Sequence, residues 1–504
     1  MEKEEKQGIF AEQIIYDAVL EQGAEIDCIV PDYCPEVFRT LSCTLSPRIM
    51  SYAVSSDGKL SIDGEIAAFA LYSNEDGGQL CTVTGRTAFS KTITLGAYSD
   101  DVRFSLSEDY CTSRAVSPRR IDVRGSVSIG IKAFGCTQIS RPDIPENLEL
   151  KTEEIACAGK TIFSSKKLVL REEIDTGASG ISFVIDSSAV PKITDLRIVA
   201  DKAVLKGTIC VDALYGVAMP ESSASTTAEK MTADVPVSAI LDVAGISDEY
   251  TAIPSISILG FELIPRADSG VMSCEITAEC TVKAAAETKV NIASDAYSTS
   301  YETEINTGKI KLGSVPKPIS QSFQLKLSAK PDEDIAAVWD CRAEIKNAAA
   351  RNIGSDYVLS GLLRCRAYGK SAGGSIFFIE KQEPFEQKLL SGIGENSAVC
   401  FSANVSSASF AIMPDNSIEI TAMCDVSGDM REAITLDALS SVKLLEDKPK
   451  QKDGEFAIRI CYADEPKDCW DIAKEYNTTV SALLEENTVN DENKLEGMIV
   501  VPSI

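Results

Sequence analysis

Apolar and polar residues alternate along most of the chain, which is the pattern of strands with one buried face. Arg119–Lys132 and Met272–Val282 show it most clearly, with apolar side chains at nearly every second position. Asp57-Gly58 separates two further runs, and this dipeptide favours a tight hairpin turn because glycine tolerates a positive φ. The pattern predicts a mainly β protein whose strands pair antiparallel.

Residues 9–22 (IFAEQIIYDAVLEQ) fit two structures. Ile14, Ile15, Ala18 and Val19 would share one face of a short amphipathic helix. The segment fits an edge strand equally well, and the pattern does not decide between the two.

One strand pattern occurs three times. It runs from Gly64 to Tyr72 (GEIAAFALY), from Gly207 to Tyr215 (GTICVDALY) and, one residue shorter, from Gly361 to Tyr368 (GLLRCRAY). The glycines are 143 and 154 residues apart, which is the length of a domain rather than of a solenoid repeat. We therefore expect three similar domains in which the three tyrosines occupy one equivalent position.

The repeats and the changes in composition divide the chain into five parts. The first three are predicted to be β-sandwich-like domains with antiparallel strands. A polar, charged stretch (LLEDKPKQKDGE) then has the composition of a linker. The predicted bounds are 1–160, 161–295 and 296–445 for the three domains, 446–455 for the linker and 456–504 for the last part.

The last part of the chain has a different pattern. We expect a strand at 456–461, helices at 468–476 and 480–487, and a closing strand at 498–501. This order predicts a small β-α-α-β unit.

The amino-acid counts exclude several kinds of chemistry. The 504 residues contain no histidine, which removes Ser-His and Cys-His nucleophile pairs and His-ligated zinc. The 16 cysteines form no CxxC motif, so zinc ribbons and thioredoxin-like redox sites have no support. Cys274 and Cys280 fall among the inward positions of an alternating run and are expected to be small buried hydrophobes.

Charge and apolar runs limit the partners and the compartment. The net charge of −27 disfavours nucleic acid and anionic lipid. The first residues, MEKEEKQGIF, do not have the pattern of a secretory signal, and no apolar run reaches the roughly 18 residues that span a bilayer. We expect a cytoplasmic protein with reduced thiols, bound to other proteins and not inserted in a membrane.

Two short motifs suggest catalysis only superficially. Gly159-Lys160-Thr161 resembles the end of a phosphate loop, but Glu154 stands where the loop needs its first glycine. Ser56 and Lys59 have a Ser-x-x-Lys spacing that the Asp57-Gly58 turn explains. The expectation is a protein that is not an enzyme and uses no metal or cofactor; a hydrolase with paired carboxylates is the least supported alternative.

PDYCPEVFRTL, at residues 31–41, resembles the signature of the SPOCS domain family of spore-forming bacteria, with Glu36 and Val37 as mild departures. The later repeats keep traces of it at Pro191–Ile193 and Asp334-Ile335. The resemblance covers about residues 20–445 through the repeats. Within the signature, Val37, Phe38 and Leu41 are expected to be buried anchors.

The last part resembles a LysM domain. Residues 467–476 (KDCWDIAKEY) match the family's first-helix motif, with Lys467 in place of a small Gly and Cys469 in place of Thr. The second helix and the ending also match, at Val480, Leu483, Asn487, Leu495, Gly497, Val501 and Pro502.

SPOCS-like repeats followed by one LysM-like domain imply a non-catalytic adaptor in spore coat assembly. The resemblance implies that the LysM domain docks the morphogenetic ATPase of the coat basement and that the SPOCS domains contact other coat proteins. It also implies a location in the mother-cell cytoplasm, with recruitment to the forespore surface. The alternative, from the LysM resemblance alone, is a protein that binds peptidoglycan or N-acetylglucosamine.

Each reading has its own candidate residues in the last part. The partner-binding face is expected to gather around an exposed Trp470 and Ile458; a purely structural core role is the alternative for Trp470. Lys467 is bulky where the backbone would approach a sugar, which disfavours glycan binding. The partner-binding candidates are Ile458, Asp464, Lys467, Asp468, Trp470 and Asp471, and the glycan-binding candidates are Asp468, Cys469, Trp470 and Asn487.

Overall fold

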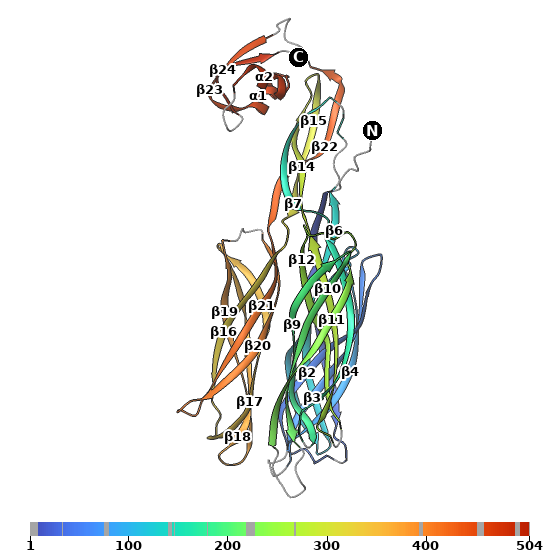
Figure 1. Cartoon of the computed structure of the whole chain (residues 1–504), viewed down its shortest axis with the longest axis vertical. Coiled ribbons are helices and arrows are strands. Elements are labelled where there is room, and N and C mark those ends of the chain that lie inside the picture. Colours follow the sequence, from blue (N-terminus) through green and yellow to red (C-terminus); the bar gives the residue numbers. More distant parts are fainter. Residues whose placement is uncertain are drawn as a thin grey trace.

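The described residues of the computed structural model form 24 strands, which pair antiparallel, and two short helices near the C-terminus (Figure 1). This confirms the predicted mainly β class. The structure describes residues 9–32, 34–74, 80–139, 144–145, 147–178, 180–217, 227–266, 269–392, 397–450, 458–488 and 494–502.

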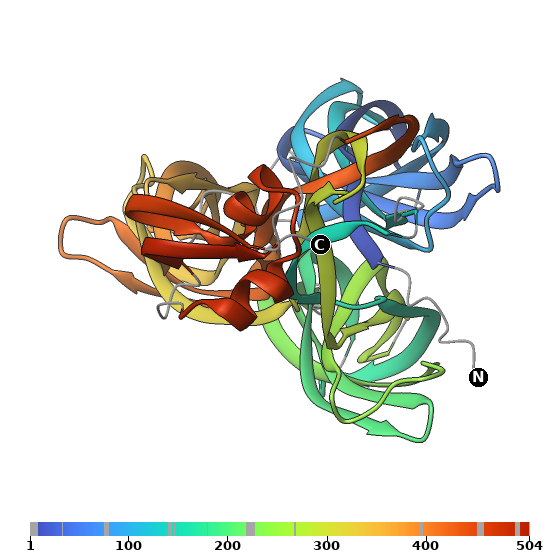
Figure 2. The same cartoon turned by 90° about the horizontal axis from the view of Figure 1, so that it is seen from above.

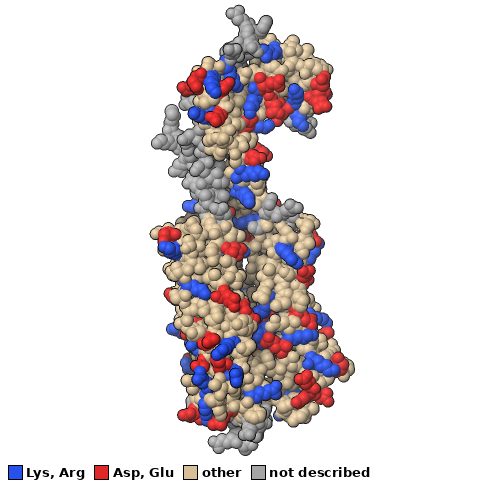
Figure 3. Space-filling view, turned by 180° about the vertical axis from the view of Figure 1, so that it is seen from behind, with Lys and Arg blue, Asp and Glu red and all other residues tan. Residues whose placement is uncertain are grey.

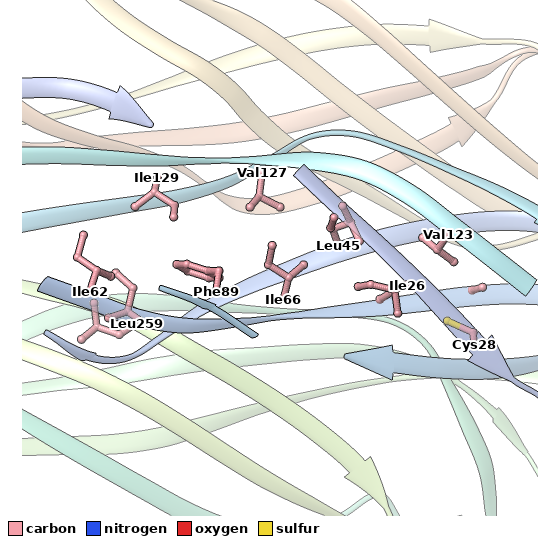
Figure 4. Packing of buried hydrophobic residues seen from close by; sticks show 14 of the residues in the cluster. Ile26, Cys28, Leu45, Ile62, Ile66, Phe89, Val123, Val127, Ile129 and Leu259 are labelled. Atoms are coloured by element: carbon pink, nitrogen blue, oxygen red, sulfur yellow. The ribbon is translucent and has the colours of Figure 1, made fainter. Parts of the chain in front are cut away.

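Six consecutive strands form the first β-unit, which consists of two three-stranded sheets. One sheet has the strand order β1-β6-β5 and the other β2-β3-β4. Apolar residues of both sheets share one core, in which Ile62 and Ile66 of β3 pack with Val127 and Ile129 of β6 (Figure 4). The strands are β1 (Ile9–Ile29), β2 (Arg39–Val54), β3 (Lys59–Ser73), β4 (Leu80–Thr94), β5 (Asp101–Ser117) and β6 (Arg120–Ile139).

The same connectivity occurs twice more. The second β-unit has the sheets β12-β13-β8 and β11-β10-β9, and the third has β16-β21-β20 and β17-β18-β19. The second contains β8 (Ile162–Asp175), β9 (Ile181–Val199), β10 (Lys202–Val217), β11 (Thr227–Asp242), β12 (Thr251–Pro265) and β13 (Val271–Ala285). The third contains β16 (Lys317–Ala329), β17 (Ile335–Ile353), β18 (Asp356–Ser371), β19 (Ile376–Ser391), β20 (Ala398–Ile412) and β21 (Ile418–Arg431).

Residues 9–22 lie within strand β1, so the strand alternative is correct and the helix is not. β1 pairs with β6 from Ile9 to Ile29, with one irregularity after Ile14. A long neighbouring strand offers the backbone of this segment a complete set of partners. Tertiary pairing therefore decides a segment whose side-chain pattern is ambiguous.

The SPOCS-like segment follows β1 and ends in the first residues of β2. Val37 is buried as expected, but Phe38 is 63% exposed, so its predicted role as a buried anchor is wrong. Arg119 donates hydrogen bonds to the carbonyl oxygens of Pro31 and Cys34, and the Tyr72 hydroxyl donates to that of Pro35 at 3.0 Å. Hydrogen bonds from the Arg119 guanidinium and the Tyr72 hydroxyl to backbone carbonyl oxygens therefore hold this segment, rather than the phenyl ring.

The repeated glycine-to-tyrosine pattern forms the central strand of one sheet in each β-unit, namely β3, β10 and β18. Tyr72 and Tyr215 are buried in the cores of their own units. Tyr368 lies on the opposite face of its strand, because the third pattern is one residue shorter and successive side chains alternate between faces. The expected equivalence of the three tyrosines is therefore wrong for Tyr368.

The position seven residues after each glycine is the equivalent one. Leu71, Leu214 and Tyr368 occupy it, and all three belong to one buried cluster that draws on the three β-units. Side chains on the outer face of each central strand therefore point toward the neighbouring units.

The three β-units surround a common axis (Figure 2). β4 of the first packs against β9 of the second, β11 of the second against β17 of the third, and β19 of the third against β2 of the first. Leu259 of the second unit also lies in the core of the first (Figure 4). The three units therefore form one interlocked body.

Buried charges join the three β-units where they meet. Arg364 of β18 and Glu108 of β5 are each 5% exposed at the side chain and form an ion pair between the third unit and the first. Lys283 of β13 is 2% exposed and places its Nζ 2.8 Å from a carboxylate oxygen of Asp101 in β5. These polar contacts lie between units whose own cores are apolar.

The segments between the β-units and the strand after the third unit form a stalk (Figure 1). β7 (Glu149–Ala158) pairs with β14 (Glu287–Tyr297), and β15 (Tyr301–Gly313) pairs with β22 (Ala433–Pro449). The two pairs pack over Cys157, Val290, Ile292, Leu312 and Ala438.

The predicted bounds at 160/161 and 295/296 fall in or beside this stalk, and the predicted linker at 446–455 begins inside β22. Residues 451–455 of that linker lie outside the described residues. The division into domains stays a prediction.

The cysteines behave as small apolar residues. Cys274 and Cys280 are buried, as predicted from their alternating run. Every cysteine whose side chain the structure describes is free. Among the described residues, no helix has the length and apolar character needed to cross a membrane.

Candidate functional site

The candidate site is the tail of the chain, which lies at the far end of the stalk (Figure 1). It contains β23 (Ile458–Asp468), α1 (Cys469–Glu475), α2 (Val480–Glu486) and β24 (Lys494–Pro502), in the predicted β-α-α-β order. The two strands pair antiparallel, and both helices pack on one face of the sheet through Cys469, Ile472, Ala473, Leu483, Leu495, Ile499 and Val501.

Each helix begins at a capping side chain. Asp468 has an extended backbone, and its carboxylate accepts a hydrogen bond from the Trp470 amide at 2.9 Å. Thr479 caps α2 in the same way through the amide of Ala482. An Asp or Thr at this position satisfies an amide that has no partner within the helix. Asp468 therefore has a structural role in the tail.

Trp470 is buried, with 6% of its surface exposed. Its Nε1 donates to Asp295 Oδ2 at 2.8 Å, and its ring meets Tyr297 edge to face, with 4.9 Å between the centroids. Both partners lie on β14 of the stalk. The predicted exposed Trp470 is therefore wrong, because a strand 175 residues away in sequence covers this side chain.

Ion pairs surround the covered tryptophan. Lys474 of α1 places its Nζ 2.7 Å from Asp295 Oδ2, and Lys151 of β7 places its Nζ 2.8 Å from Asp468 Oδ2. The tail also accepts a hydrogen bond at the Thr478 carbonyl oxygen from the hydroxyl of Tyr297, at 2.7 Å. The stalk therefore binds the α1 side of the tail through one aromatic contact and several charged or polar ones.

These contacts shift the acidity of both carboxyl groups. Burial by itself would raise the pKa of Asp295, but hydrogen bonds from Lys474 and Trp470 outweigh it and leave the pKa below its usual 3.8. Burial also acts on Asp468, where hydrogen bonds from Lys151 and the Trp470 amide again bring the pKa below 3.8. Both groups are ionised at neutral pH.

Acid should release the tail from the stalk. A carboxyl group whose pKa is lowered by a contact stabilises that contact at every pH above the ordinary pKa of the group, here 3.8. The stabilisation is lost as the pH falls through the lowered pKa, because the carboxylate is then protonated. In a Trp339→Phe variant, the emission of Trp470 should therefore shift to longer wavelength below pH 3.8. In a Trp470→Phe variant, Trp339 reports on the β-units, and a coincident transition of the two would instead indicate general acid unfolding.

Ile458 lies on the other side of the tail from Trp470. With Ile460 and Tyr462 of β23 and Met498 of β24 it forms the face of the two-stranded sheet that the helices leave uncovered, here called the hairpin face. These side chains are 54%, 63%, 73% and 67% exposed, respectively. Ile460 pairs with Val500 and Tyr462 with Met498, so the apolar side chains adjoin across the strands.

The other predicted residues separate into two groups. Asp464, Lys467 and Asp471 are exposed. Cys469 is buried in the tail core, and the Asn487 side chain donates to the carbonyl oxygens of Leu483 and Val500. The four glycan candidates thus all make contacts within the chain, and Ile458 and Trp470 do not share a surface.

The stalk residues that face the tail were not predicted from the sequence. Asp295, Tyr297 and Lys151 lie in segments assigned to the β domains, and only their packing against the tail distinguishes them. The hairpin face was partly visible beforehand, since Ile458, Ile460 and Tyr462 alternate with the inward residues Cys461 and Ala463.

A family model matches part of the chain. Residues 181–264, which run from β9 to β12, match the family model described as SipL, SPOCS domain. The match supports a SipL-like SPOCS protein. Comparison with curated proteins and with solved structures gave no significant match.

Proposed function

We propose that this protein is a non-catalytic adaptor in spore coat assembly, and that its three β-units are SPOCS domains followed by a LysM domain. The family match at 181–264 supports a SipL-like sporulation protein. The identical strand connectivity of the three β-units supports extending the SPOCS assignment to the first and third. The β-α-α-β order of the tail supports the LysM assignment.

The hairpin face is the observation that carries the proposal. Four large apolar side chains with more than half of their surface exposed adjoin on one small sheet, and such a patch marks an interaction site. Residues 455–504 carry four basic and eleven acidic side chains, so a partner with an apolar centre and a basic rim would complement the tail. Charged side chains of both signs lie over the tail on the face seen from behind (Figure 3).

In this proposal the hairpin face docks the morphogenetic ATPase of the coat basement, and the β-units contact other coat proteins. The protein would act in the mother-cell cytoplasm and gather on the forespore surface through that docking. The proposed docking face includes Ile458, as predicted, but does not include Trp470. The glycan-binding alternative is less favoured, because Asp468 and Trp470 contact the stalk and Asn487 is bonded to the backbone of the tail.

Charged substitutions on the hairpin face should abolish most of the docking. Tyr462→Glu combined with Met498→Glu places two carboxylates at the centre of the apolar patch, while the tail core is left intact. The affinity of the full chain for the purified ATPase should fall about thirtyfold or more, equivalent to about 2 kcal/mol, in a titration of the two proteins.

Ser481→Glu is the matched control, because it adds a carboxylate to an exposed position of α2 away from the hairpin face. Its affinity should equal that of the unchanged chain. If the double variant binds the ATPase as tightly as the unchanged chain does, the hairpin face is not the docking surface. Retention of the unchanged chain on insoluble peptidoglycan, without binding to the ATPase, would favour the glycan reading instead.

A further inference from the structure

The contact between tail and stalk has the composition of a reversible interface. Its centre is one indole ring against Tyr297, whose hydroxyl also donates to the Thr478 carbonyl oxygen. Around this centre lie the pairs Lys474–Asp295 and Lys151–Asp468 and a hydrogen bond from Lys450 to Asn477. The side chains of the two ion pairs are 23–41% exposed. An aromatic centre with a charged, partly hydrated rim is typical of surfaces that bind and release.

Most of the tail core comes from the tail itself, and Tyr297 of the stalk joins it from outside. Seven of its apolar residues pack between the two helices and the sheet, and its helix caps come from Asp468 and Thr479 within the tail. Partly exposed ion pairs contribute little to stability. Small polar interfaces between parts of one chain usually permit relative motion.

We propose that the stalk residues Asp295, Tyr297 and Lys151 form a latch that covers the α1 side of the tail and can release it. In the closed arrangement the stalk of the same chain covers Trp470, so a partner can reach the hairpin face but not Trp470. In the open arrangement Trp470 and Tyr297 become accessible as a second aromatic surface. This inference does not rest on the proposed function, since it concerns contacts within the chain.

The latch has a quantitative consequence for any ligand of the α1 side. Such a ligand binds the open arrangement alone, so its apparent affinity is reduced by the fraction of molecules that are open. A ligand of the hairpin face binds both arrangements and is unaffected. The closed arrangement is therefore autoinhibitory for one side of the tail and neutral for the other.

The test uses the full chain with Trp339→Phe, so that Trp470 is the sole tryptophan. Asp295→Ala with Tyr297→Ala removes the centre of the latch, and Asp437→Ala changes an exposed carboxylate of β22 as the matched control. The acrylamide quenching constant of Trp470 should rise about threefold or more in the double variant, since the indole passes from a buried to an exposed position. The control should leave it unchanged.

Amide hydrogen exchange of residues 469–486 distinguishes release from unfolding. Continued protection of α1 and α2 together with increased quenching supports the latch. Loss of that protection would show that stalk and tail form one folding unit, and unchanged quenching would show that other contacts hold the tail. Full accessibility of Trp470 before any latch substitution would show that the closed arrangement is not populated. Each of these last three results overturns the proposal.

Discussion

Replacing Arg364 by methionine should lower the free energy of unfolding by about 3–5 kcal/mol, because it leaves Glu108 buried without its counter-ion. The Arg364 guanidinium donates to Glu108 Oε1 at 2.5 Å and to Glu380 Oε2 at 2.7 Å. Glu108 also accepts from the Leu45 amide, so its carboxylate cannot turn toward solvent without breaking a second hydrogen bond. A urea titration of the full chain measures the loss.

Arg351→Met provides the comparison. Arg351 pairs with Glu386, and the two side chains are 64% and 60% exposed, so its loss should change the free energy by about 1 kcal/mol or less. Adding Glu108→Gln to Arg364→Met should restore part of the stability, because the amide oxygen still accepts from Leu45 and position 108 no longer carries a buried charge. Equal effects of the Arg364 and Arg351 substitutions would show that the contact between the first and third β-units is hydrated.

Leu214→Ala should cost about 2–5 kcal/mol, which is the range for removing a fully buried leucine from a packed cluster. Leu214 is 0% exposed and meets Leu71 and Tyr368 at the junction of the three β-units. The free-energy change of the double variant Leu71→Ala, Leu214→Ala should differ from the sum of the two single changes, since the two side chains share one cluster. The same urea titration reports both effects.

Ile240→Ala serves as the control for the leucine substitutions. Ile240 is on β11 in the same β-unit and is 51% exposed, so its truncation should change stability by about 0.5 kcal/mol or less. A small effect of Leu214→Ala, comparable to that of Ile240→Ala, would mean that the three β-units do not pack together in solution.

The strands of the β-units were predictable because each unit buries its own core. Along β3, β10 and β18, the inward positions are apolar in all three repeats, and alternation alone identifies them. The outward positions meet different neighbours in each unit and have diverged: three residues after the glycine stand Ala67, Cys210 and Arg364. No local pattern shows that such residues face a neighbouring unit.

The elements of the tail were also predictable, because the tail buries most of its own core, but its contact with the stalk was not. Helix caps and inward apolar residues follow from spacing within some fifty residues, whereas the cover over Trp470 comes from β14. The sequence around an aromatic residue at the start of a helix does not show whether solvent, a partner or a distant strand lies beside it. The stalk strands also escaped prediction, since each finds its partner across a complete β-unit.

The cyclic packing of the β-units restricts how this protein can assemble. A contact between one edge of a unit and a different edge of the next unit is heterologous. Repeated heterologous contacts form a filament unless the last unit returns to the first and completes a ring. Here three units in a single chain complete the turn, because β19 returns to β2. Each complementary edge already has its partner, so a unit from another molecule cannot extend the series. Polymerisation through these edges is therefore prevented, and higher-order contacts must use surfaces outside the ring.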